Sequence, residues 1–81
     1  MNMPTLPDVT TQPSYKMLRL KQVIEYTGLS RSTIYDIMDI KSKRHDATFP
    51  RSVQLTQATV AWIESEINDW LELRIHKSRA A

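Results

Sequence analysis

Two short groups of apolar side chains repeat with helical spacing in the first half of the chain. The groups are Val23, Ile24 and the aliphatic side of Thr27, followed by Ile34, Ile37 and Met38. Gly28 follows the first group, and Ser30 precedes the second. Glycine readily takes the left-handed conformation that ends a helix, and serine is a strong N-cap. The pattern therefore predicts a helix over 21–27, a tight turn, and a second helix after Ser30, which is the arrangement of a helix-turn-helix.

Shorter β-prone runs flank this helical pair. Residues 15–20 alternate irregularly between apolar and polar side chains and predict a brief strand. Residues 41–46 are polar, mostly basic and without apolar periodicity, so they predict a loop. The runs 51–55 and 60–62, separated by 56–59, predict a hairpin, although its turn lacks a glycine. A hairpin in this position would form the wing of a winged helix-turn-helix.

The last part of the chain predicts a third helix over 64–77. Five side chains recur there at helical spacing: Ile63, Ile67, Trp70, Leu71 and Arg74. Acidic residues come early in this segment and basic residues late, as the helix dipole favours. Trp62, at the end of a strand, and Trp70, on the apolar stripe, are predicted to lie in the core. The expected fold class is mainly α with a small β-hairpin, a three-helix winged helix-turn-helix.

The remaining composition narrows the class of protein. Residues 1–14 contain three prolines and no periodicity, so we expect a flexible N-terminal tail before a single domain over 15–78. The chain of 81 residues has no cysteine, no signal-peptide pattern and no long apolar run, which favours a soluble cytoplasmic protein with no membrane partner. His45 and His76 lack partners at metal-ligand spacing, and the one glycine is in the helical turn. We therefore expect no metal, no cofactor and no enzymatic activity.

Positive charge is concentrated around the predicted helix-turn-helix. The whole chain has a formal net charge of +2, but residues 16–51 hold eight basic and four acidic residues, a local net charge of +4. A basic region of this kind is typical of a nucleic-acid binder. Its densest part is Lys41, Lys43 and Arg44 in the predicted loop, for which we expect phosphate contacts. The alternative is a basic loop that is merely solvated.

The second helix presents the candidate reading residues. The polar side chains opposite its apolar stripe are Arg31, Ser32, Tyr35 and Asp36. In a major groove, arginine can pair with guanine, and hydroxyl groups can pair with bases or phosphates. Any amphipathic helix shows polar residues outward, so the turn, the cap and the wing are needed to support this interpretation. Thr33 lies close to the helix terminus, and its position favours a capping or packing role. The candidate DNA contacts of the wing are Arg51, Gln54 and Gln57.

Three motifs give the chain a resemblance to a known family. They are Thr-Gly-Leu-Ser-Arg-Ser-Thr-Ile-Tyr (27–35), Phe-Pro-Arg (49–51) and Val-Ala-Trp-Ile-Glu-Ser-Glu-Ile-Asn-Asp-Trp (60–70). With the motifs in this order, residues 20–74 resemble the AlpA family of prophage regulators. The resemblance implies a compact winged-helix fold akin to the MerR and excisionase group. It places the following residues in the recognition-helix motif and at the start of the wing: Ser30, Arg31, Ser32, Thr33 and Tyr35, then Arg51.

The chain departs from the pattern of this family in the loop and the wing. The basic segment 41–46 is several residues longer than is usual in the family. Ser52 stands where a second proline is common, and Thr56 and Ala58 stand where the family tends to place glycine and arginine. The wing tip therefore lacks the arginine for the family's usual phosphate contact.

The expected function is sequence-specific binding of double-stranded DNA. The resemblance implies that the protein belongs to a prophage or genomic island and that it regulates integrase and excision genes or acts as an excisionase-like recombination directionality factor. A module this small should bind weakly as a single copy, so we expect several copies to associate on repeated sites. The alternative is a protein-interaction adaptor, antitoxin-like or anti-regulator, that uses the fold without DNA. The acidic third helix favours this alternative, and the local charge of +4 opposes it.

Overall fold

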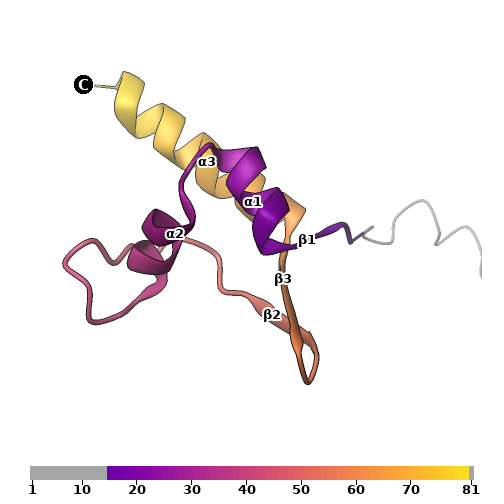
Figure 1. The fold of residues 1–81 in the computed structure, drawn as a ribbon. Coiled ribbons are helices and arrows are strands. Elements are labelled where there is room, and N and C mark those ends of the chain that lie inside the picture. Colours follow the sequence, from indigo (N-terminus) through magenta and orange to yellow (C-terminus); the bar gives the residue numbers. More distant parts are fainter. Residues whose placement is uncertain (1–14, 81) are drawn as a thin grey trace, which may run out of the picture.

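A computed structural model of the protein describes residues 15–80 and contains three helices and three short strands (Figure 1). In chain order the elements are β1 (Met17–Leu18), α1 (Leu20–Thr27), α2 (Arg31–Met38), β2 (Val53–Thr56), β3 (Thr59–Ile63) and α3 (Glu64–Arg79). The predicted fold class, mainly α with a small hairpin, is confirmed. The predicted tail over 1–14 lies outside the described residues, and the domain boundary at residue 78 stays a prediction.

The end of α1 is fixed by Gly28. Its φ is 77°, in the left-handed region, and its backbone N–H donates to the carbonyl of Ile24 at 2.9 Å. A side chain at this position would be strained, so glycine is the residue that the turn requires. Thr27 Oγ1 donates to the carbonyl of Val23 at 2.8 Å and accepts from the N–H of Leu29 at 3.2 Å. The predicted break between the two helices is therefore confirmed in position and in cause.

The sheet has three antiparallel strands in the order β1-β3-β2. The hairpin turn is Gln57 and Ala58 alone, because Thr56 and Thr59 already pair, so the predicted separation over 56–59 was too long. The predicted strand over 15–20 is shorter than expected. Its last residues turn into α1, where Gln22 Oε1 accepts from the N–H of Arg19 at 2.8 Å. The pairing of β1 with β3, through Met17 and Ile63, was not predicted.

One hydrophobic core joins the sheet to all three helices. Its buried members are Leu18, Val23, Ile34, Phe49, Trp62, Ile67 and Trp70. Both tryptophans lie in the core as predicted, with 2% of Trp62 and 8% of Trp70 exposed. The ring of Phe49 meets Trp70 edge to face, with centroids 5.0 Å apart. The guanidinium of Arg74 stacks on the Trp70 ring, which explains an arginine on the apolar stripe of α3.

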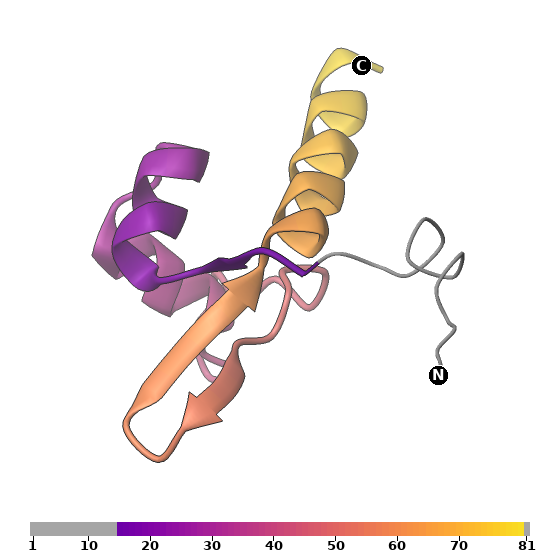
Figure 2. The same cartoon turned by 90° about the vertical axis from the view of Figure 1, so that its right-hand side faces the viewer.

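The hairpin and the C-terminal half of α3 project from opposite ends of this body (Figure 2). The late turns of α3 are exposed, and Leu73 and Ile75 are its large apolar side chains with substantial accessibility. No helix within 15–80 combines the length and apolar character needed to cross a membrane.

Candidate nucleic-acid interface

The short helix α2 presents one exposed and one buried face. Arg31, Ser32 and Tyr35 are exposed, and we call these three residues the reading face. Ile34 points the other way and is fully buried in the core. The outward orientation expected for these side chains is therefore present, whereas their contact with DNA stays a prediction.

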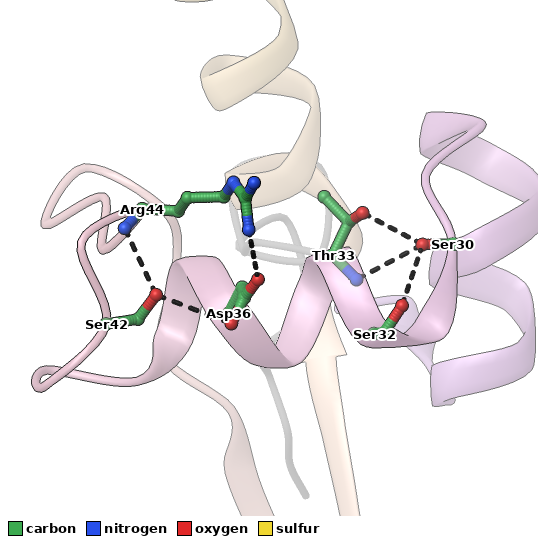
Figure 3. A network of polar contacts seen from close by, with 6 residues as sticks. All are labelled: Ser30, Ser32, Thr33, Asp36, Ser42 and Arg44. Atoms are coloured by element: carbon green, nitrogen blue, oxygen red, sulfur yellow. Dashed lines mark hydrogen bonds and ion pairs between the residues drawn. The ribbon is translucent and has the colours of Figure 1, made fainter.

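The first turn of α2 is fixed by a hydroxyl network around Ser30 (Figure 3). Ser30 Oγ accepts from the N–H of Thr33 at 3.1 Å and lies 2.8 Å from Thr33 Oγ1 and 3.3 Å from Ser32 Oγ. The predicted N-cap role of Ser30 is confirmed. Thr33 is half-buried and its hydroxyl is used in this network, in keeping with the interpretation of Thr33 as a capping residue. The network holds the beginning of the reading face in one geometry.

The other end of α2 carries a second polar network, also drawn in Figure 3. Arg44 Nη1 donates to Asp36 Oδ2 at 3.1 Å, and Ser42 Oγ donates to Asp36 Oδ1 at 3.4 Å. The backbone N–H of Arg44 donates to Ser42 Oγ at 3.1 Å. Two of the predicted DNA contacts, Asp36 and Arg44, are therefore bound to each other.

The residues that follow α2 form a series of turns rather than an unrestrained loop. We call residues 39–46 the basic loop. The N–H of Ser42 donates to the carbonyl of Asp39 at 2.9 Å, and that of His45 to the carbonyl of Ser42 at 3.1 Å. The loop returns to α2 where the N–H of Asp46 donates to the carbonyl of Ile37 at 2.9 Å. Lys41 and Lys43 are exposed on this folded segment.

Asp46 is a residue whose role the sequence reasoning missed. Its carboxylate accepts from both the hydroxyl and the N–H of Thr48, and from Trp70 Nε1 at 3.1 Å. Arg74 Nη1 lies 3.6 Å from the same carboxylate, whose side chain is 18% exposed. The hydrogen bond from the Thr48 hydroxyl is the main cause that lowers the pKa of Asp46 below its ordinary value of 3.8, against partial burial. Asp46 thereby ties the end of the basic loop to α3.

The local part of this role had a sequence signal. An aspartate two residues before a threonine is a common Asx turn, as the contacts with Thr48 show. The contacts with Trp70 and Arg74 join residues more than twenty positions apart, so no local pattern could indicate them.

The hairpin differs from the basic loop in having no charged residue over 52–63. Gln54 Nε2 donates to the carbonyl of Gln57 at 3.1 Å, so one predicted DNA contact is used inside the hairpin. Leu55 and Val60 are 47% and 42% exposed. Arg51 is exposed just before β2 and carries the positive charge nearest to the hairpin in the sequence.

The structure places the predicted site residues in two groups. The first group lies on α2 and the basic loop: Ser30, Arg31, Ser32, Thr33, Tyr35, Asp36, Lys41, Lys43 and Arg44. The second lies before and along the hairpin: Arg51, Gln54 and Gln57. The hairpin projects away from α2 (Figure 1), whereas Arg51 lines a cavity together with Met38 and Ile40 after the reading face and His45 of the basic loop.

A glycine turn between two short helices, a second helix with one exposed face and a following hairpin define a small winged helix-turn-helix protein. A family model described as "Prophage CP4-57 regulatory protein (AlpA)" matches residues 16–75. The chain therefore belongs to the AlpA family of prophage regulatory proteins.

Two curated relatives give the extent of the similarity. The "DNA-binding transcriptional activator AlpA" of Escherichia coli (strain K12) is 46% identical over 66 residues, which cover 82% of this chain and 94% of that protein. The "Uncharacterized protein ORF88" of Enterobacteria phage P4 is 39% identical over 70 residues, 86% of this chain and 69% of that protein. No solved structure matches this chain.

Proposed function

We propose that this protein is a prophage regulator that binds double-stranded DNA in a sequence-specific manner, with α2 in the major groove. The similar protein from Escherichia coli carries the name of a DNA-binding transcriptional activator. Family membership and the winged helix-turn-helix architecture both support the same role for this chain. The acidic residues early in α3 favour the adaptor alternative, but neither the family membership nor the named relative supports it.

The reading face is the observation that carries this proposal. The side chain of Arg31 is exposed in the first turn of α2 and forms no hydrogen bond or ion pair with any residue in 15–80. Its donors can therefore pair with O6 and N7 of a guanine, the commonest specific contact in the major groove. Ser32 and Tyr35 place hydroxyl groups beside it on the same exposed face.

The hairpin serves as a wing of low charge in this proposal. Over 52–63 it offers amides and hydroxyls but no cation, so Arg51 supplies the electrostatic contact nearest the wing. The affinity for the phosphate backbone of DNA then comes mainly from the cations of the basic loop. A module this small binds weakly as a single copy, so several copies would bind side by side on repeated sites. In this proposal the protein regulates integrase and excision genes or acts as an excision factor. It does not catalyse a reaction.

The test starts from a duplex that the protein selects from a randomised library, with a mixed-sequence duplex as the reference. Arg31→Ala should cost about 1 to 3 kcal/mol on the selected duplex and reduce discrimination at one or two base pairs. Lys77→Ala, which removes one exposed cation from the last turn of α3, is the matched control and should leave discrimination unchanged. Recovery of no preferred sequence by the wild-type protein would overturn the proposed function.

A further inference from the structure

Asp36 is an acidic residue beside the reading face, where a negative charge repels DNA phosphates. It stands in the last turn of α2. A carboxylate near the C-terminal end of a helix opposes the helix dipole, and aspartate is a poorer helix former than alanine. Asp36 therefore weakens both the helix and the attraction of the helix for DNA unless a partner compensates.

Arg44 is that partner, and two routes join it to Asp36. The direct route is the contact of 3.1 Å between Arg44 Nη1 and Asp36 Oδ2 (Figure 3). The indirect route passes through Ser42, whose hydroxyl donates to Asp36 and accepts from the backbone N–H of Arg44. Both the backbone and the guanidinium of Arg44 are thus positioned from one carboxylate.

This ion pair is too exposed to serve mainly the stability of the fold. The side chain of Arg44 is 77% exposed and that of Asp36 is 41% exposed. Ion pairs at such exposed positions contribute little to stability. Within 15–80, Nη2 and Nε of Arg44 form no hydrogen bond or ion pair, so these donors are available to an external acceptor.

The position of Arg44 indicates which acceptor that is. Its contact with Asp36 holds the Arg44 guanidinium on the flank of α2, beside a cavity of about 450 Å³ that lies between α2, the basic loop and α3 and includes no residue of the reading face. When a helix occupies the major groove, its exposed face meets base edges and its flanks run beside the two phosphate backbones. A guanidinium on the flank therefore meets a phosphate oxygen.

We propose that Asp36 is a positioning residue that holds Arg44 on the flank of α2, so that Arg44 binds a phosphate of the DNA backbone. The proposal rests on the proposed function, because it requires α2 to bind DNA. Asp36 itself makes no DNA contact and instead restricts the conformations that Arg44 would otherwise lose on binding. The consequence is an inverted response to charge: removing the acid at Asp36 weakens DNA binding.

A double-mutant cycle tests this coupling with Asp36→Ala, Arg44→Ala and the double variant. Binding to the selected duplex and to the mixed-sequence duplex is measured at several salt concentrations. In each single variant the slope of log K against log salt should become less steep by up to about 0.9. The double variant should show no larger change than a single variant. Asp69→Asn, which removes an exposed acid from α3, is the matched control and should leave DNA affinity unchanged or slightly raised.

Three outcomes would overturn the proposal. Tighter binding by Asp36→Ala would make the carboxylate a repulsive charge only, and additive losses in the double variant would make the two residues independent. A loss confined to one base pair in a panel of single-base variants would place Arg44 on a base edge instead of a phosphate. Thermal melting of each variant separates these results from unfolding. Failure of the wild-type protein to bind either duplex would instead be a failure of the proposed function.

Discussion

The basic loop and the hairpin both follow the predicted reading helix, but different forces hold them in place. The loop carries three cations, and its shape depends on the side chains of Asp36, Asp39 and Asp46. The hairpin has no charge over 52–63 and is held by the backbone hydrogen bonds between its strands β2 and β3. Asp39 and Asp46 reduce the net charge of the loop, and Asp36 on α2 holds the guanidinium of Arg44.

This comparison shows that the number of polar or charged side chains in a segment does not tell which of them are already held by contacts within the protein. All three cations of the loop are exposed, but Arg44 is paired with Asp36, whereas Lys41 and Lys43 form no ion pair within 15–80. In the hairpin, the side chain of Gln54 was expected to contact DNA, but it donates to the carbonyl of Gln57 in the turn. In both regions a residue chosen from the sequence as a ligand contact first makes a contact within the protein.

The largest effect is expected where the basic loop depends on the core. Trp70→Ala removes the ring against Phe49 and Arg74 and the donor to Asp46, and should cost about 3 to 5 kcal/mol of unfolding free energy. A domain of this size has little stability to spare, so DNA binding should be lost through unfolding. Leu55→Ala in the exposed hairpin is the control and should change stability by less than about 0.5 kcal/mol. A Trp70→Ala variant that melts like the parent and fails to bind DNA would instead make Trp70 a contact residue.

A smaller loss of stability, with a defined pH dependence, is expected at Asp46. Asp46→Asn weakens the contacts to Thr48, Trp70 and Arg74 and should destabilise the fold by about 1 to 3 kcal/mol near neutral pH. The pKa of Asp46 is lowered on folding, so its ionised form stabilises the fold. This contribution is complete above the unfolded-state value near 3.8 and is lost as pH falls through the lower folded-state value.

Denaturant unfolding of the two proteins across acidic pH measures this effect. The difference in stability between the wild-type protein and Asp46→Asn should shrink as pH falls below 3.8. A difference that is constant with pH would show that the charge of Asp46 is irrelevant and that only its hydrogen-bonding shape matters. Asp69→Asn, at an exposed site on α3, should show no comparable dependence.

The smallest effect is expected on the salt dependence of DNA binding, when the exposed lysines of the loop and the glutamines of the wing are replaced in turn. Alanine at both Lys41 and Lys43 should weaken selected and mixed-sequence DNA about equally and lower the salt slope by up to about 0.9 for each lost phosphate contact. Alanine at both Gln54 and Gln57 removes no charge and should leave the salt slope unchanged. Fluorescence anisotropy titrations at several salt concentrations measure both variants. Equal slopes for the lysine variant and the parent would show that the basic loop is merely solvated. A changed slope in the glutamine variant would contradict the expectation that the wing makes no electrostatic contact through these residues.

The sequence by itself determined the helical pair and its boundaries. Apolar spacing gave the buried faces of α1 and α2, Gly28 gave the end of the first helix and Ser30 the start of the second. These features are predictable because each depends on hydrogen bonds between residues a few positions apart. The outward orientation of Arg31 follows from the same periodicity.

Tertiary contacts determine which polar residues are held within the protein. Asp46 reaches Trp70 and Arg74 on α3, and β1 pairs with β3 across most of the chain. The pair of Asp36 and Arg44 spans eight residues, but it forms because the intervening segment folds back on α2. Contacts of this kind depend on how a loop closes, and composition and periodicity carry no information about closure. For that reason the sequence located the cations, while the fold determined which of them are held and by which carboxylate.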